Sequence, residues 1–393
     1  MLRSFRVENH KSIKDEQELS LLPAYDKSRP VVPVAAIFGA NASGKSNLLD
    51  ALRWLQNAVR TSYAAWEAGS GVPRTPFRLD AKSAESPSGY AVEIEVDGAR
   101  YSYGVEVDGE RVRNEWLHTY PRSRRRIIFE RDDDGLRLGS TVPDYKTRAV
   151  VLARQTRGNA LFLSVAAQND LAEVRPVYDW FRAGLMMADE WPERWAEEFG
   201  KLIEGPRRRT VVDLVRAADV GITDIRFAPG YQMHRWLDIE FRHGASDTWL
   251  TTGEESAGTV RWLHLIVPTL RALDTGAVLC VDEIDASMHP RLTASFVGLF
   301  RDSQVNRHAA QLVFTTHDAT LLDPILGDDT MRRDEVWFVE KQGDGATTLY
   351  SLADFKPRKL ENWERRYLAG GYGAIPLASE WEFRRAFDDD TAA

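Results

Sequence analysis

A phosphate-binding motif stands near the start of this 393-residue sequence. Residues 39–46 follow the spacing G-x-x-x-x-G-K-[ST]. In such a loop the glycines let backbone N–H groups surround phosphate oxygens, the lysine reaches the β and γ phosphates, and the next hydroxyl ligates Mg²⁺. The sequence therefore predicts a nucleotide site, with Gly39, Asn41, Ser43, Gly44, Lys45, Ser46 and Asn47 as its candidate residues.

Two acids and a histidine follow apolar runs in the second half of the chain. Asp282 and Glu283 come after the run 277–281, and His317 comes after the run 310–316. Acidic side chains at the end of a buried strand are costly to bury, so they indicate a function such as binding Mg²⁺ and activating water. Because parallel sheets bind ligands outside the carboxyl ends of their strands, we expect the loop, the acids and the histidine to share one site.

A polar turn precedes the apolar helix that is predicted over residues 260–273. The turn spans residues 253–259 and contains Ser256 and Gly258. The free N–H groups and the dipole at the start of a helix favour an anion. Taken alone, this turn is a helix cap.

The elements that must position these residues follow from hydrophobic periodicity. The pattern predicts a strand over 34–38, a helix over 47–60, a hairpin from 2–8 and 17–21, and an antiparallel sheet between 90 and 138 with Asp-Gly turns. The phosphate loop then lies between a strand and a helix, as its chemistry requires. Lys11 and Ser12, in the hairpin turn, are interpreted as exposed turn residues rather than nucleotide contacts.

Helical spacing of apolar and aromatic residues from 171 to 202 predicts a helical insertion. Its tryptophans, Trp180, Trp191 and Trp195, are interpreted as packing residues rather than as a platform for stacking bases.

Composition restricts the class of protein. The chain is 43% hydrophobic and 28% charged, which is ordinary for a globular protein, and it carries one cysteine, Cys280. No apolar run approaches the roughly 18 residues of a membrane span, and the N-terminus does not read as a signal peptide, so we expect a cytoplasmic protein. The net charge of −8 argues against a surface uniformly coated for nucleic acid.

Two arginine clusters are the exception to this acidic balance. They lie at residues 122–126 and 207–209. A solvated turn, balanced for the first cluster by the acids at 132–134, is favoured over a phosphate site.

In their order along the chain, the motifs resemble ABC-type ATPases of the SMC and OLD kind. Four segments, at residues 2–12, 159–164, 255–259 and 367–376, resemble abortive-infection ATPases of the RloA and AbiL type. Residues 257 and 259 depart from the common L-S-G-G-Q signature of the superfamily. No sustained heptad repeat predicts the coiled-coil arms of SMC proteins.

The resemblance implies ATP and Mg²⁺ as cofactors and a role for each candidate. Asp282 would support the metal with Ser46, Glu283 would polarise the attacking water, and His317 would sense the γ-phosphate. Asp285 would be the D-loop residue, and Gln168, preferred over Gln155, would be the Q-loop residue beside the metal. Ser256 and Gly258 would act in trans across a head-to-tail dimer.

The expected fold class is α/β, an ABC-ATPase head with a central, mostly parallel sheet, an antiparallel β lobe and a helical insertion. Residues 1–145 and 246–356 would form the nucleotide-binding domain including the β lobe. Residues 146–245 would form the mostly helical insertion, and residues 357–393 a C-terminal tail.

The leading functional hypothesis is an ATPase switch of an anti-phage, abortive-infection or toxin–antitoxin system. It would dimerise on ATP, with higher oligomers left open, and control a separate toxic effector of the Toprim nuclease type, because the chain lacks the Toprim acids after residue 317. The alternative is an SMC-like ATPase that binds DNA in repair or maintenance. A third class, the chain acting as its own toxin, ranks lowest.

Overall fold

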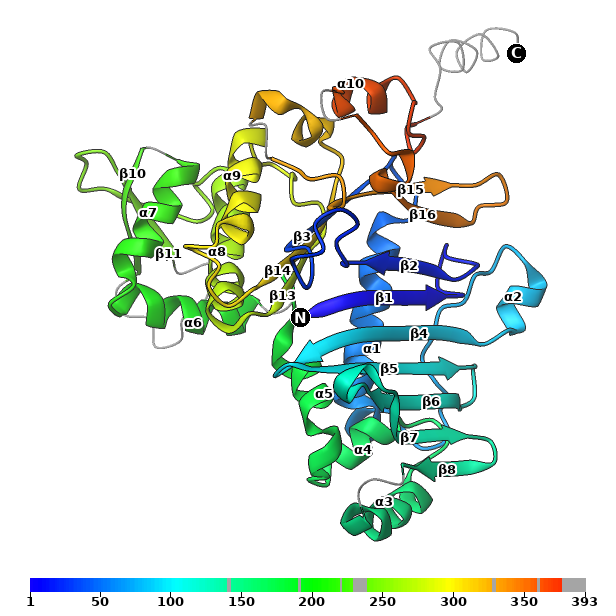
Figure 1. The fold of residues 1–393 in the computed structure, drawn as a ribbon. Coiled ribbons are helices and arrows are strands. Elements are labelled where there is room, and N and C mark those ends of the chain that lie inside the picture. Colours follow the sequence, from blue (N-terminus) through cyan, green and yellow to red (C-terminus); the bar gives the residue numbers. More distant parts are fainter. Residues whose placement is uncertain are drawn as a thin grey trace, which may run out of the picture.

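A six-stranded, mostly parallel sheet carries the phosphate loop in this computed structural model (Figure 1). The structure describes residues 1–139, 143–189, 192–219, 221–228, 239–326, 330–358 and 361–376. The strand order is β16-β15-β3-β14-β13-β9, and only β16 runs antiparallel to its neighbour. The strands are β3 (Val34–Phe38), β9 (Leu185–Met187), β13 (Val278–Val281), β14 (Gln311–Thr316), β15 (Val336–Lys341) and β16 (Thr347–Ser351).

Both faces of this sheet are buried. On β3, Val34, Ala36 and Phe38 belong to one hydrophobic cluster, whereas Ala35 and Ile37 belong to another. A parallel sheet covered on both sides reads as a continuous apolar run, which explains why the motif strands were visible in the sequence.

The second sheet is a seven-stranded antiparallel lobe with the order β2-β1-β4-β5-β6-β7-β8. Its strands are β1 (Leu2–Glu8), β2 (Gln17–Ser20), β4 (Ser88–Val96), β5 (Ala99–Val107), β6 (Val112–Thr119), β7 (Arg126–Asp132) and β8 (Gly135–Leu138). The predicted hairpin and antiparallel sheet are confirmed, and the hairpin joins the sheet through β1 and β4. The mixed α/β fold with a mostly parallel central sheet is likewise confirmed.

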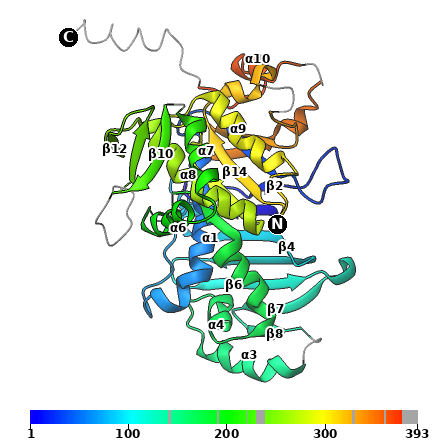
Figure 2. The ribbon, with the colours of Figure 1, turned by 90° about the vertical axis from the view of Figure 1, so that its left-hand side faces the viewer.

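Helix α1 (Lys45–Ala65) follows the phosphate loop and packs under the lobe. Its buried face includes Leu48, Leu52, Leu55 and Val59, which share a cluster with the inner residues of the lobe. Figure 1 shows α1 running behind the lobe strands, and Figure 2 shows α8 (Ala257–Thr275) and α9 (Pro290–Arg301) in front of β14.

The region predicted as a helical insertion, residues 146–245, also contributes strands. Its helices are α3 (Pro143–Gln155), α4 (Phe162–Gln168), α5 (Arg175–Asp179), α6 (Pro192–Glu204) and α7 (Arg208–Ala218). However, β9 extends the central sheet, and β10 (Ile222–Phe227) and β11 (Ile239–His243) form a small sheet with β12 (Trp249–Thr251). Helix α4 of this region packs on α1, whereas α6 and α7 pack on α8. The predicted boundaries of the nucleotide-binding domain and the insertion stay a prediction.

Other predictions for this region have a direct outcome. Trp180 and Trp195 are buried, so their interpretation as packing residues is confirmed. Trp191 lies outside the described residues, as does residue 377 onward of the predicted tail. The part of the tail that is described ends after α10 (Trp363–Leu368). Within the described part of the chain, no helix is long and apolar enough to span a membrane.

The shorter helices complete the fold. They are α2 (Ala81–Glu85) and the single turns Pro121–Ser123, Ala172–Val174, Trp180–Gly184, Ala319–Leu322, Pro324–Leu326 and Leu352–Phe355.

A buried carboxylate fixes α4 to the lobe. Glu115 on β6 accepts hydrogen bonds from the N–H groups of Phe162 at 2.6 Å and Leu163 at 2.8 Å, and from the Tyr103 hydroxyl at 3.1 Å. The guanidinium of Arg131 lies 3.6 Å away. No side chain of α4 itself caps its first turn, so Glu115 takes over that task from the neighbouring sheet.

Removing this carboxylate should destabilise the lobe strongly. We expect Glu115→Ala to lower the free energy of unfolding by about 3–5 kcal/mol. Two buried N–H groups would lose their acceptor, and the Arg131 guanidinium would keep its two backbone carbonyl acceptors but lose its buried counter-charge. The control is Glu93→Ala, which breaks a partly exposed pair with Arg100 and should cost less than about 1 kcal/mol. Urea denaturation followed by tryptophan fluorescence compares the two, and equal losses would contradict the role given to Glu115.

Candidate functional site

The phosphate loop is held in shape by close backbone packing. Gly44, directly before α1, has a φ of 108°, and a Cβ there would lie 2.2 Å from Thr347 Oγ1. A Cβ on Gly39 would lie 2.4 Å from the carbonyl oxygen of Val339. Both glycines are therefore required by space, and Gly44 is also required by its backbone conformation.

Lys45 lies inside the loop and is only 5% exposed. Its Nζ donates to the carbonyl oxygens of Gly39 at 2.7 Å and Ala40 at 2.9 Å, and lies 3.2 Å from His317 Nδ1. Burial lowers the pKa of Lys45 to about 8, although nearby carboxylates, first that of Glu283, oppose the shift. The ammonium thus stands at the centre of the loop, where phosphate oxygens can replace the two carbonyls.

The hydroxyl of Ser46 meets the carboxylate of Asp282. Ser46 Oγ donates to Asp282 Oδ1 over 3.1 Å, and the hydroxyl of Thr315 donates to the same oxygen over 2.5 Å. Thr315 also accepts the N–H of Glu283 at 2.8 Å. A hydroxyl and a carboxylate are the oxygen donors that Mg²⁺ prefers, so Ser46 and Asp282 fit the predicted metal role.

The other predicted catalytic residues lie beside this pair. Glu283 Oε1 is 3.6 Å from His317 Nε2, and the backbone N–H of His317 is 3.3 Å from both oxygens of Asp285. Glu283 has a φ of 49°, a left-handed conformation that few residues with a side chain adopt. The carboxyl ends of β13 and β14 thus bring these three side chains to the loop, as the sequence predicted.

Ser12 and Thr347 also support the loop. Ser12 Oγ accepts from Asn47 Nδ2 at 2.6 Å and lies 2.6 Å from Thr347 Oγ1. Thr347 Oγ1 donates to the carbonyl oxygen of Ser43 at 2.8 Å. The interpretation of Ser12 as an exposed turn residue is therefore wrong, because the hairpin turn packs against the loop.

Two further loop residues differ in exposure. Ser43 is buried and its hydroxyl has no hydrogen-bond partner among the described residues, whereas Asn41 is exposed at the tip of the loop. A buried hydroxyl without a partner is costly, which suits a group that a ligand satisfies.

Ser256 and Gly258 lie at the start of α8. Ser256 Oγ accepts the N–H of Thr259 at 3.0 Å, so the predicted cap is present. A Cβ on Gly258 would lie 2.4 Å from the carbonyl oxygen of Ser287, in the turn after Asp285. Within the described ranges, no hydrogen bond joins either residue to loop 39–46 of the same chain.

Gln168 does not lie with the metal residues. Its Nε2 reaches the carbonyl oxygen of Arg60 at 3.5 Å, and Arg60 is 14 residues beyond Ser46 on α1. At 1.5 Å per residue this is about 21 Å along the helix. The prediction of Gln168 as a metal ligand is therefore wrong, because α4 docks at the far end of α1.

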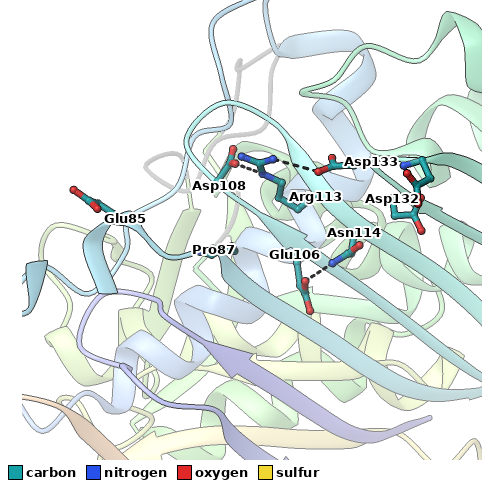
Figure 3. A pocket seen from close by; sticks show the side chains of 9 residues that line it. Glu85, Pro87, Glu106, Asp108, Arg113, Asn114, Asp132 and Asp133 are labelled. Carbon is teal, nitrogen blue, oxygen red and sulfur yellow. Dashed lines mark hydrogen bonds and ion pairs between the residues drawn. The ribbon is translucent and has the colours of Figure 1, made fainter. Parts of the chain in front are cut away.

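A separate acidic hollow lies on the lobe and is shown in Figure 3. Arg113 pairs there with Asp108 and Asp133, and Asn114 donates to Glu106. The expectation that the acids at 132–134 balance the first arginine cluster is wrong for Asp133. It pairs with arginines of β6 and its preceding turn, while Arg125 of the cluster pairs with Glu130.

Comparison with known protein families identifies the family of this chain. The matching family is described as "AAA domain, putative AbiEii toxin, Type IV TA system", and the match spans residues 34–323, about three quarters of the chain. The chain belongs to this family. The matched span of this AAA-domain protein includes the phosphate loop, Asp282, Glu283 and His317. An ATPase is thereby supported, and the finer resemblance to RloA and AbiL stays a prediction.

Solved structures similar to this AAA-domain protein include two SMC heads. One is an Smc head bound to the C-terminal winged-helix domain of ScpA, with 14% identity, a TM-score of 0.44, and coverage of 91% of this chain and 99% of that chain. The other is an Smc head with an extended coiled coil bound to the C-terminal domain of ScpA, derived from Pyrococcus furiosus, with 14% identity, a TM-score of 0.43, and coverage of 90% and 97%. A search of curated proteins finds no match.

Nucleotide binding should depend on pH through Lys45. Because burial lowers its pKa to about 8 and phosphate oxygens stabilise the ammonium, binding above this pH should take up a proton and weaken as the pH rises. Isothermal titration calorimetry between about pH 7 and about pH 9.5, in buffers of different ionisation enthalpy, measures this uptake.

The matched control is Lys45→Arg, whose guanidinium stays protonated over that range. Whatever ATP binding this variant keeps should show no such proton uptake. Equal uptake in both proteins would show that a group other than Lys45 titrates.

Proposed function

We propose that this chain is a Mg²⁺-dependent ATPase that acts as the switch subunit of an anti-phage, abortive-infection system. One observation carries the ATPase part: the loop, Asp282, Glu283 and His317 meet at one edge of the central sheet, with Ser46 Oγ 3.1 Å from Asp282 and Lys45 Nζ 3.2 Å from His317. A structural turn needs no such convergence of hydroxyl, ammonium, carboxylates and imidazole.

Each residue then has a task in hydrolysis. Lys45 would exchange the carbonyls of Gly39 and Ala40 for phosphate oxygens. Ser46 and Asp282 would hold Mg²⁺, which would neutralise charge on the phosphates. Glu283 accepts a hydrogen bond from the attacking water and orients it. His317 contacts the γ-phosphate, since its ring lies between Lys45 and Glu283.

Dimerisation is the second part of the proposal. The exposed start of α8 offers free N–H groups and a helix dipole, and Ser256 does not bond to the loop of its own chain. In a head-to-tail dimer, Ser256 and Gly258 of one protomer would face the γ-phosphate bound by its partner. The buried hydroxyl of Ser43, which has no hydrogen-bond partner in the described part of the chain, and the exposed Asn41 complete the binding residues on the other side.

The defence role is supported by the toxin–antitoxin wording of the family description. β15 and β16 belong to the central sheet that carries the phosphate loop, with β16 at its edge, so the region after His317 is part of the nucleotide-binding unit. We therefore assign toxicity to a separate effector, a nuclease of the Toprim type. The same family description names a toxin, which favours a second candidate in which this chain itself is toxic.

Expression in bacteria without neighbouring genes distinguishes these two candidates. Under the switch proposal, cells that express the wild-type chain alone grow like cells that express Lys45→Ala. Growth arrest by the wild type, relieved by Lys45→Ala, would instead assign the toxic activity to this chain.

Glu283→Gln should separate binding from hydrolysis. We expect ATP turnover to fall by at least about 100-fold while ATP binding survives, because the amide cannot act as a base toward water. Light scattering after size-exclusion chromatography should then detect an ATP-stabilised dimer. Glu18→Gln, an exposed change on β2, is the control and should behave as wild type; unchanged turnover in Glu283→Gln would refute the assignment.

The alternative of a DNA-binding ATPase draws support from the exposed arginines at 122, 124 and 126. If it holds, replacing all three with alanine should weaken binding to duplex DNA and make the salt dependence shallower. Fluorescence anisotropy at several salt concentrations measures both. We expect no salt-sensitive DNA binding by the wild-type protein.

A further inference from the structure

Three side chains with metal-ligating atoms meet beside the turn that begins α8. Asp219 directly follows α7, His243 ends β11, and Glu255 precedes Ser256. Their ligating atoms all lie within 4.8 Å of one another, and His243 Nε2 is 2.7 Å from Glu255 Oε1. Residues from three separate elements thus converge on one point, and Glu255 also lines the pocket that Glu283 lines.

Burial and charge set this cluster apart from an ordinary surface ion pair. The side chain of Glu255 is 4% exposed and that of His243 is 31% exposed. Among the described residues, His243 is the only side chain that bonds to the Glu255 carboxylate. The nearly buried carboxylate is thus held by one imidazole, with a second carboxylate close by, which is a set of groups that a cation can bind.

The backbone leaves room for the cluster. A Cβ on Gly221 would lie 3.1 Å from Asp219 Oδ1 and 3.2 Å from His243 Nδ1, so any larger residue there would crowd both ligands. The N–H of Gly221 donates to Asp219 Oδ1 at 2.8 Å and orients that carboxylate. Such an outer hydrogen bond is what positions a ligand in a metal site.

The donor set selects the class of ion. One imidazole nitrogen and two carboxylate oxygens suit divalent ions such as Mn²⁺, Fe²⁺, Co²⁺ or Zn²⁺, whereas Mg²⁺ favours oxygen alone. Bonds of about 2.0–2.2 Å to such an ion would replace the direct contact between His243 and Glu255.

We propose that Asp219, His243 and Glu255 bind a divalent transition-metal ion that fixes the turn before Ser256. The ion ties the end of α7 and the end of β11 to residues 253–255, and so positions the start of α8. The proposed site shares no residue with the loop or with the Asp282–Glu283 pair, although Glu255 and Glu283 line the same pocket, so the two sites are tested separately.

Cobalt binding tests the site directly. The 393-residue chain is stripped of metal with a chelator and kept free of nucleotide in a buffer with excess Mg²⁺. It is then titrated with Co²⁺ while the visible absorption of bound cobalt and the heat of binding are recorded. We expect one Co²⁺ per chain. His243→Ala should weaken its binding by more than about 100-fold.

Control variants decide where the ion sits. His308→Ala removes an exposed histidine outside the cluster and should bind Co²⁺ as wild type does, and so should Asp282→Asn. Loss of binding in Asp282→Asn alone would place the ion at the nucleotide site and overturn the proposal.

Folding of the variants is checked by circular dichroism. If His243→Ala fails to fold, Asp219→Asn and Glu255→Gln replace it, since each keeps the size of its side chain. Wild-type protein that binds no Co²⁺, or binding that survives in both of these variants, would show that the three residues form only a structural hydrogen-bonded cluster.

Discussion

One carboxylate oxygen joins the ends of neighbouring strands, and the site depends on it. Asp282 Oδ1 accepts from Ser46 at the start of α1 and from Thr315 near the end of β14, while Asp282 itself directly follows β13. The same threonine holds the backbone of Glu283, and Arg261 of α8 donates to the carbonyl oxygen of Asp282 at 2.8 Å. The relative positions of β3, β13 and β14 therefore determine the distances among all the reactive groups. This is why the site requires a sheet that is packed on both faces.

Packing on both faces comes from dividing the chain between two cores. The antiparallel lobe, α1 and α4 cover one face of the central sheet, and α8 and α9 cover the other. Glu115 strengthens the first of these two cores, because this carboxylate of the lobe caps α4, whose first residue is 47 positions later in the chain. The phosphate loop is placed at the boundary, where hydrogen bonds from Ser12 and Thr347 reach it from the hairpin and from β16.

The parts that were predictable from the sequence are those in which neighbours along the chain determine the result. The strand 34–38, the loop, the helix that follows it and the acids after a buried run are all local patterns. Ser12 and Thr347 are 335 residues apart, and no local sequence pattern predicts their contact. Gln168 was misplaced for the same reason, because its position depends on where α4 docks along α1. The three-residue strand β9 is too short for periodicity to reveal within a helical region.

The close packing of Gly258 on Ser287 has a consequence for how a dimer would communicate. The start of α8 packs against the turn after Asp285, and Arg261 donates to the backbone of Asp282, so this helix end and the catalytic turn form one packed unit. In the proposed dimer, a nucleotide bound by one protomer would contact this unit of the other protomer. Occupation of one site would then change the geometry of the second, and ATP would bind cooperatively.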